Sequence, residues 1–404
     1  MIIEFRFSNF LSYKEETIIN FTPVKSFKEL TKSNIIETSK DFNLLKTTAI
    51  YGSNAGGKTN FVEAMGFMTD IIHNSFAESL KKEEERGRQD YYFKLSTTTI
   101  NKPTSFEVSF IIDNIIYRYG FKILGFKIIS EWLYKKLDAE TMLFERANQE
   151  FKINNKGFPE GNKYKNDVNA NVLFLSHLAQ NNAKESSNIF HWFADLNVIS
   201  GLEDKYHKNA TLTLLNKSTK FKAWLNLAVK FLEISNIESS KDDKLIAYHN
   251  KYDENNIIID STSFDFEKDE SAGTKKLIYL LGAIYDTLKF GKILFIDELD
   301  AKLHPNVSKR LLDLFHKFNC NKAQFVFTAH DAFLMDKEIF RRDQIWFVDK
   351  NKFGSSELYS MSDFDASVVR NTSDFKKKYL SSSFGAAESI EISNNLIDFI
   401  YEKK

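Results

Sequence analysis

Apolar and polar residues alternate with a period of two in several stretches of the first 155 residues, which is the spacing of β-strands. The alternation predicts strands at 2–7, 17–21, 105–112, 115–123, 128–137 and 142–146, with a weaker one at 150–153. Asp113-Asn114 separates two of these runs and predicts a tight two-residue hairpin turn. The first third of the chain therefore reads largely as antiparallel β-structure.

A helical period follows in other stretches. It predicts a helix through Phe61, Val62, Met65, Met68 and Ile72, short helices at 173–180 and 189–196, and a longer one through Phe221, Trp224, Leu225, Ala228 and Leu232. Strands return at 245–248 and 257–260. This order predicts one α/β body with an N-terminal half at 1–168, a small helical insertion at 169–240 and a C-terminal half at 241–404.

Composition adds few constraints. Lys+Arg 55 balances Asp+Glu 55, so net charge gives no argument for nucleic acid, although a local patch could still bind it. The single cysteine, Cys320, fits a reducing compartment. The N-terminus does not resemble a signal peptide, and the apolar run at 277–284 is too short to span a bilayer. We therefore expect a cytoplasmic protein with no membrane contact.

The clearest chemical signal is a glycine-rich stretch between a predicted buried strand at 47–51 and the first predicted helix. It reads Gly52-Ser53-Asn54-Ala55-Gly56-Gly57-Lys58-Thr59-Asn60, which matches the phosphate-binding pattern G-x-x-x-x-G-K-T. The glycines let backbone N–H groups surround a phosphate chain at a helix N-terminus. Lys58 would contact the β- and γ-phosphates, and Thr59 would bind Mg²⁺. We therefore expect the chain to bind a nucleoside triphosphate with Mg²⁺.

A second apolar strand, at 293–296, ends in Asp297-Glu298. In phosphate-loop enzymes such a strand lies beside the loop, so Asp297 is expected near Mg²⁺ and Glu298 is expected to accept a proton from the attacking water. A surface Asp-Glu pair is the alternative, and the presence of the loop favours the catalytic interpretation. A strand at 324–328 then delivers His330, which could hydrogen-bond a γ-phosphate oxygen.

Ser271, Gly273 and Thr274 begin another predicted helix, whose apolar face carries Leu277, Leu280, Leu281 and Ile284. Small residues at a helix start can bind an anion. They can equally form an ordinary N-cap, and local sequence alone favours the N-cap.

Taken in order, these motifs resemble the ABC-type ATPase heads of the SMC, RecF, RecN and OLD families. The resemblance rests on 52–60, 271–277, 293–305 and 325–331. The stretches 270–277 and 296–305, with the tail at 342–348 and 356–359, are more narrowly similar to compact ATPases of bacterial abortive-infection and phage-defence operons, a circle that includes RloA, PtuA and AriA. The resemblance implies an α/β, ABC-type P-loop ATPase head with a mixed or parallel core sheet and an antiparallel β lobe.

The resemblance also implies a head-to-tail dimer with ATP between two copies. Ser271, Gly273 and Thr274 of one copy would act in trans on the nucleotide held by Lys58 of the other, Asp300 would couple the two sites, and His330 would sense the γ-phosphate. The chain departs from the pattern in lacking a clear glutamine loop, for which Gln89 is the only nearby candidate, and in lacking the Arg expected near 379–385.

Three interpretations stay open from sequence. The first is an Mg²⁺-dependent ATPase that serves as sensor or motor subunit of an anti-phage system and controls a separate effector, such as a nuclease, encoded nearby. The second is a RecF-like repair ATPase that clamps DNA. The third is a scaffold that binds ATP with negligible hydrolysis. The absence of room for an effector domain after His330 favours the first.

Overall fold

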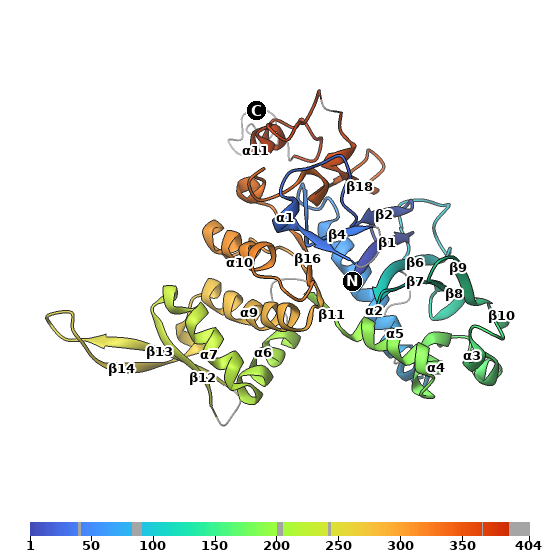
Figure 1. The fold of residues 1–404 in the computed structure, drawn as a ribbon, viewed down its shortest axis with the longest axis horizontal. Helices are drawn as coiled ribbons and strands as arrows, with labels where there is room; N and C mark the ends of the chain where they lie inside the picture. The colour runs from blue at the N-terminus through green and yellow to red at the C-terminus, as the bar shows by residue number, and fades with distance from the viewer. Residues whose placement is uncertain (39–41, 83–90, 200–204, 241–243, 366, 388–404) are drawn as a thin grey trace, which may run out of the picture.

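Two large sheets of different character make up most of the fold (Figure 1). The computed structural model describes residues 1–38, 42–82, 91–199, 205–240, 244–365 and 367–387. Gln89 and most of the charged run at 81–88 lie outside these residues. Within the described ranges, no helix combines the length and the apolar character that crossing a bilayer requires.

The antiparallel sheet has seven strands in the order β10-β9-β8-β7-β6-β1-β2. Their bounds are β1 Ile2–Ser8, β2 Thr17–Asn20, β6 Thr104–Ile112, β7 Ile115–Leu124, β8 Lys127–Lys136, β9 Glu140–Ala147 and β10 Glu150–Ile153. The predicted hairpin turn is confirmed, because Asp113 and Asn114 adopt positive φ angles of 47° and 65° between β6 and β7. This sheet is the predicted antiparallel lobe.

The central sheet is mixed, with the order β11-β15-β16-β5-β17-β18 and one antiparallel pair, β17 with β18. Its strands are β5 Thr47–Gly52, β11 Leu196–Ile199, β15 Ile293–Ile296, β16 Gln324–Thr328, β17 Ile345–Lys350 and β18 Ser356–Ser360. The strand β5 therefore lies between two strands that come from the far end of the chain. The predicted α/β head with a mixed core sheet and an antiparallel lobe is confirmed.

Both faces of the central sheet are buried, which explains why its strands are continuous apolar runs. Ile50 of β5 faces the core shared with the antiparallel lobe and α2, whereas Ala49 and Tyr51 face the core shared with α9 and α10. The same alternation holds for Phe295 against Leu294 in β15. The strands that precede the predicted site motifs are thus packed against a hydrophobic core on each face.

The main helices are α2 Lys58–Ser79, α4 Phe174–Gln180, α5 Lys184–Ala194, α6 Lys205–Lys217, α7 Thr219–Ala228, α9 Ala272–Phe290 and α10 Pro305–Lys317. Most of them overlap the predicted periodic segments, but α6 was not predicted, and the helix predicted to run through Leu232 ends at Ala228. Shorter helices are α1 Thr31–Asn34, α3 Pro159–Tyr164, α8 Phe266–Asp269 and α11 Phe375–Leu380. Single 3-10 turns lie at η2 Lys230–Leu232, η3 Ala332–Leu334, η4 Arg342–Gln344 and η5 Met361–Asp363.

Two small sheets complete the described chain. One is the pair β3 Ile35–Glu37 and β4 Asn43–Leu45. The other contains β12 Ile234–Ser239, β13 Leu245–Tyr252 and β14 Ile258–Asp265, and Figure 1 shows its long β13–β14 hairpin projecting on the side opposite the antiparallel lobe. This hairpin leads through α8 directly into α9.

The segment 169–240 is not purely helical. Leu196, which we expected at the end of a helix, begins β11, and β11 pairs in parallel with β15 in the central sheet. That helix prediction is wrong at its end, because a four-residue apolar stretch has no periodicity long enough to separate strand from helix. The boundaries at 168 and 240 stay a prediction.

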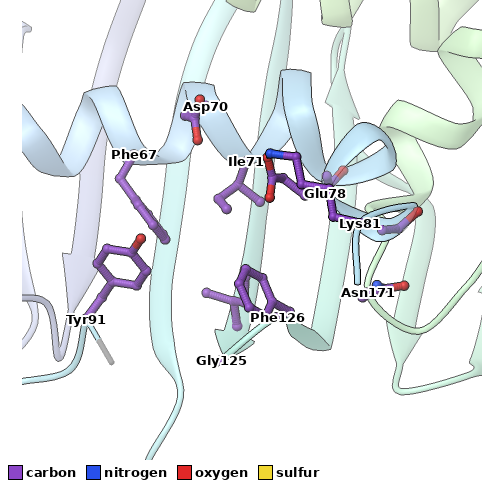
Figure 2. A pocket seen from close by; sticks show the side chains of 12 residues that line it. Phe67, Asp70, Ile71, Glu78, Lys81, Tyr91, Gly125, Phe126 and Asn171 are labelled. Atoms are coloured by element: carbon purple, nitrogen blue, oxygen red, sulfur yellow. The ribbon is translucent and has the colours of Figure 1, made fainter. Parts of the chain in front are cut away.

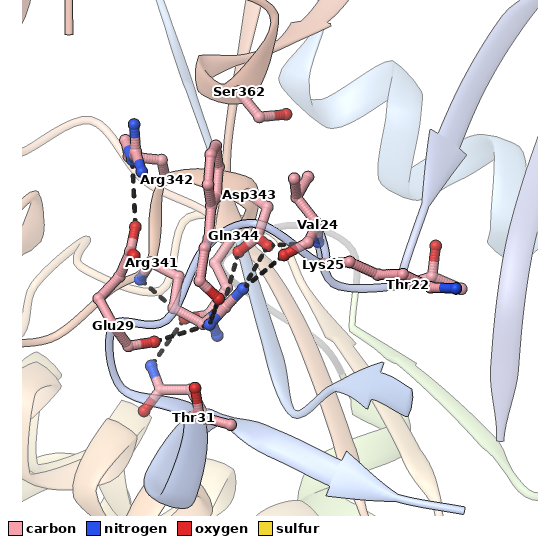
Figure 3. Close-up of polar contacts among 12 residues, drawn as sticks. Thr22, Val24, Lys25, Glu29, Thr31, Arg341, Arg342, Asp343, Gln344 and Ser362 are labelled. Carbon is pink, nitrogen blue, oxygen red and sulfur yellow. Dashed lines mark hydrogen bonds and ion pairs between the residues drawn. The ribbon is translucent and has the colours of Figure 1, made fainter. Parts of the chain in front are cut away.

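A buried arginine cluster fastens the N-terminal segment 22–30 to the C-terminal half (Figure 3). Arg341 is fully buried, and its guanidinium donates to both carboxylate oxygens of Asp343 at 2.9 and 2.7 Å and to the carbonyl of Glu29 at 2.7 Å. Asp343 also accepts the backbone N–H of Val24 at 2.7 Å. Because β17 begins just after this cluster, the contacts fix the strand that flanks β5.

Candidate nucleotide-binding site

The glycine-rich stretch lies where the sequence predicts it, between β5 and α2. No side chain of the described residues caps α2, whose N-cap residue is Gly57. Asn54 and Ala55 are exposed, and Ser53, Thr59 and Asn60 are partly exposed. The first turn of α2 therefore offers backbone N–H groups and the positive end of a 22-residue helix at an accessible edge of the central sheet.

Two of the glycines are required by close backbone contacts. A Cβ atom at Gly52 would lie 2.1 Å from the carbonyl oxygen of Val348 in β17. A Cβ atom at Gly57 would lie 2.3 Å from Oγ of Ser356, and Gly57 also has a φ of +122°, which disfavours other residues. The loop conformation thus requires glycine at these two positions, and a loop of this kind offers backbone N–H donors to a phosphate chain.

Lys58 folds over this loop. Its ammonium donates to the carbonyl oxygens of Gly52 at 2.8 Å and Ser53 at 2.9 Å, and the residue is 5% exposed. The positive charge is therefore held against the backbone of the loop.

Three residues that sequence reasoning missed support the loop from behind. The Tyr13 hydroxyl donates to the Gly57 carbonyl at 3.1 Å, and the Ser356 hydroxyl donates to the Gly56 carbonyl at 2.6 Å. Ser356 also contacts the Ser12 hydroxyl at 2.8 Å, and Asn60 donates to that hydroxyl at 2.7 Å. Burial raises the pKa of Tyr13, which keeps its hydroxyl protonated as a donor. Ser12 and Tyr13 lie between the strands predicted at 2–7 and 17–21, and no sequence pattern indicated this role.

Asp297 follows β15 and is 2% exposed. Its Oδ1 accepts a hydrogen bond from the Thr328 hydroxyl at 2.6 Å, and the same hydroxyl accepts the backbone N–H of Glu298 at 2.7 Å. Thr328 ends β16, so one hydroxyl aligns both acidic residues against the neighbouring strand. A buried carboxylate at the end of a strand has the chemistry of a hard-cation ligand.

The strand of Asp297 is not the direct neighbour of the loop strand β5 in the sheet. The order is β15-β16-β5, so β16 lies between them. The cause is long-range: β16 pairs with β15 on one side and with β5 on the other, which local sequence does not specify. All three strands still end at the same edge of the sheet, because they are parallel.

Glu298 and His330 come together at this edge. The His330 Nε2 atom lies 3.6 Å from Glu298 Oε1, with side chains 38% and 29% exposed. Glu298 adopts a positive φ of 52°, which is unusual for a residue with a side chain. Asp300 accepts the backbone N–H groups of His330 at 2.8 Å and Asp331 at 2.5 Å, so it joins the loop after β15 to the loop after β16.

Ser271 is the N-cap of α9, as predicted. Its hydroxyl accepts the Thr274 N–H at 3.1 Å, and Ser271 is exposed. Gly273 packs closely against the loop after β15, since a Cβ there would lie 2.6 Å from the carbonyl oxygen of Lys302. The local N-cap is confirmed; a contact of these residues with a second copy stays a prediction.

A separate cavity of about 340 Å³ lies between the second half of α2 and the β7–β8 turn (Figure 2). Phe67, Asp70 and Glu78 of α2 line one side, and Gly125 and Phe126 line the other. None of the predicted site residues is among the residues that line it. The cavity is therefore distinct from the phosphate loop, and we assign it no role.

A comparison with curated proteins found no match. Among solved structures, an SMC head domain from Thermotoga maritima is 14% identical, with a TM-score of 0.44, and the match covers 89% of this chain and 98% of that one. An SMC head bound to the C-terminal winged-helix domain of ScpA is 15% identical, with a TM-score of 0.40 and coverage of 89% and 97%. Similarities this low say nothing about ligand or partner.

The comparison with protein families is more direct. It matches residues 47–336, from the strand before the phosphate loop to the segment after His330, to the family described as "AAA domain, putative AbiEii toxin, Type IV TA system". The matched region holds all the predicted site residues and most of the 404-residue chain. The chain therefore belongs to this AAA-domain family and is a P-loop ATPase of that kind.

Proposed function

We propose that the chain is an Mg²⁺-dependent ATPase that acts as the sensor or motor subunit of a bacterial anti-phage, abortive-infection system. The observation that carries the proposal is the arrangement at one edge of the central sheet. There the glycine-rich loop with Lys58, the buried Asp297 and the Glu298–His330 pair all follow strands of the same sheet. Such an arrangement supplies phosphate binding, a metal ligand and a proton acceptor together.

The residues of the chain would divide the chemistry as follows. The loop N–H groups and Lys58 would bind the phosphates of ATP and fix them for attack in line. Thr59 and Asp297 would hold Mg²⁺, which when bound neutralises charge on the phosphate oxygens. Glu298 would accept the proton of the attacking water, and His330 would hydrogen-bond the γ-phosphate. The N–H of Glu298 is anchored on Thr328, which supports a fixed position for its carboxylate.

Dimerisation belongs to the same proposal. Ser271 and Ala272 are exposed at the start of α9, a helix of 19 residues, and Gly273 and Thr274 follow in its first turn. A helix start of this kind favours a negative ligand. Two copies arranged head to tail would place Ser271, Gly273 and Thr274 of each copy against the nucleotide of the other. The negative charge of ATP would then bind both the phosphate loop of one copy and the start of α9 of the other. Hydrolysis would then release the dimer.

The defence role rests on the resemblance described above and on the family match, whose description mentions a putative AbiEii toxin and a type IV TA system. In this proposal the ATPase controls a separate effector, such as a nuclease, made from a nearby gene. The alternative, a RecF-like ATPase that clamps DNA, has the same head but needs no effector. Nucleic-acid binding is open in both.

The ATPase proposal is tested by nucleotide binding, turnover and oligomeric state of the purified full chain. Lys58→Ala should abolish binding of a fluorescent ATP analogue, and Glu298→Gln should bind ATP but accumulate an ATP-dependent dimer in light scattering. Glu254→Gln, at an exposed position beside the β13–β14 turn, is the matched control and should behave as wild type. Turnover that survives both site variants would refute these roles.

The defence proposal is tested in cells. Co-expression with the adjacent gene should arrest growth or block phage, and Lys58→Ala should remove the effect. ATP-dependent, salt-sensitive DNA binding by the isolated chain, with no effect of the neighbouring gene, would favour the RecF-like alternative instead.

A further inference from the structure

Lys276 lies on α9 about one turn after Gly273, and its side chain reaches back to the loop that follows β15. Its ammonium donates to the carbonyl oxygen of Ala301 at 2.8 Å and to that of Glu298 at 2.5 Å. A single lysine of α9 thus bridges the two ends of a four-residue stretch that begins at the proposed catalytic carboxylate. Hydrogen bonds from a charged donor are stronger than neutral ones, so this bridge is a substantial constraint.

The loop that Lys276 holds is in a conformation that needs support. Glu298 and Lys302 both have positive φ angles, 52° and 62°, which cost free energy for residues with side chains. Gly273 packs against the Lys302 carbonyl so closely that a Cβ would lie at 2.6 Å. The start of α9 and the loop after β15 are therefore packed as one unit, and Lys276 supplies hydrogen bonds between them.

Burial of the Lys276 side chain disfavours its charged form. Burial lowers the pKa of Lys276 to about 8, and the carboxylates of Asp300, Glu298 and Asp297 oppose this effect while Lys302 adds to it. Neighbouring Lys275 shows the contrast, because its ammonium points to the carbonyl oxygen of Glu267 at 2.7 Å, on α8. Of these two lysines, Lys276 is the one that contacts the acidic loop.

We propose that Lys276 is a positioning residue that couples the start of α9 to Glu298 of the same chain. The inference rests on the proposed function, in which the start of α9 contacts the nucleotide of a second copy while Glu298 acts on the nucleotide of its own copy. A shift of α9 on engaging the second copy's ATP is then passed through the Lys276 ammonium to the Glu298 backbone. Each site thereby becomes competent for hydrolysis only when α9 of its own chain is engaged.

The test compares three full-length variants. Lys276→Met keeps the length of the side chain and removes the donor, Lys276→Arg keeps a cationic donor, and Lys275→Met is the matched control. Two readouts are measured: backbone hydrogen exchange of residues 297–303 without nucleotide, and steady-state kcat and KM for ATP hydrolysis. The exchange measurement needs no turnover, so it remains decisive even if the chain proves not to hydrolyse ATP.

We expect Lys276→Met to raise exchange in 297–303 and to lower kcat, each by at least about tenfold, the size of one charge-assisted hydrogen bond, with KM nearly unchanged. Lys275→Met should stay within about twofold of wild type in both, as ordinary surface substitutions do. Lys276→Arg should recover most of kcat.

Equal exchange in Lys276→Met and Lys275→Met would overturn the proposal. So would raised exchange with an unchanged kcat, because the lysine would then be only structural. If wild type and Lys275→Met both fail to hydrolyse ATP, the proposed function is wrong. In that case the role of Lys276 is judged by hydrogen exchange alone, and unchanged exchange in Lys276→Met would reject it.

Discussion

Replacing Thr328 by valine removes one hydroxyl from the centre of the site and keeps the shape of the side chain. That hydroxyl is fully buried, donates to Asp297 at 2.6 Å and accepts the N–H of Glu298 at 2.7 Å. Valine puts a methyl group there, so a buried carboxylate loses a donor and a partly buried N–H loses its acceptor. Both proposed roles, metal binding by Asp297 and proton transfer by Glu298, depend on this one group.

The magnitude follows from the two bonds. A hydrogen bond to a charged group contributes about 1.5–3 kcal/mol, and an unpaired buried N–H costs about 1–3 kcal/mol. Because one hydroxyl serves both partners, the effects overlap, and we expect a total loss of about 3 kcal/mol in the free energy of unfolding. With an unfolding entropy of roughly 2.1 cal/mol/K per residue over 404 residues, this lowers Tm by about 3–4 °C.

Differential scanning calorimetry and ATP turnover measure the two consequences. Thr328→Ser keeps the hydroxyl and should cost only about 1 kcal/mol through the lost methyl group. Thr328→Val should show the full decrease in Tm and at least a roughly tenfold lower kcat, because Glu298 loses its anchor. If Thr328→Val and Thr328→Ser have the same Tm and the same kcat, the reasoning about this hydroxyl is refuted.

Three further predictions concern other parts of the chain. Gly273→Ala forces the loop after β15 to move, so kcat should fall about tenfold while binding of a fluorescent ATP analogue persists. Gly66→Ala is the control for both measurements, because the nearest contact of a Cβ atom there would be at 3.4 Å. Since burial lowers the pKa of Lys276 from 10.5 to about 8, the pH–rate profile should fall above pH 8 as the ammonium is lost. The contribution of this group to stability instead rises between pH 8 and 10.5, because only the unfolded chain still binds the proton there; urea titrations at several pH values check the sign. Arg341→Met leaves a buried carboxylate without its ion-pair partner and should cost about 3–5 kcal/mol in the free energy of unfolding, measured by thermal unfolding. Arg342→Met removes a pair whose side chains are 16% and 17% exposed and should cost less.

Local patterns predicted much of this fold because local chemistry decides the elements concerned. The glycine-rich motif, the Asp113-Asn114 hairpin and the Ser271 N-cap can each be recognised from residues within a few positions of one another, and all three are found. The pattern of apolar and polar residues likewise located α9 and β15. One face of α9 and the whole of β15 are buried, and the apolar residues that are buried stand close together in the sequence.

What the sequence did not reveal depends on contacts between distant segments. The support of the phosphate loop by Ser12 and Ser356 joins residues 344 positions apart, and no periodicity marks either serine. The placement of β16 between β15 and β5 is set by strand pairing across the whole chain. β11 was missed because four residues are too few to establish a period.

The position of β5 has a consequence for how the protein is made. Its neighbours, β16 and β17, are encoded roughly 275 to 300 residues later, and Ser356, whose hydroxyl donates to the Gly56 carbonyl, comes later still. A nascent chain on the ribosome therefore carries the whole glycine motif long before anything can hold it in shape. Nucleotide capture must therefore await translation of β16, β17 and Ser356, so products truncated before these segments would be inert toward ATP.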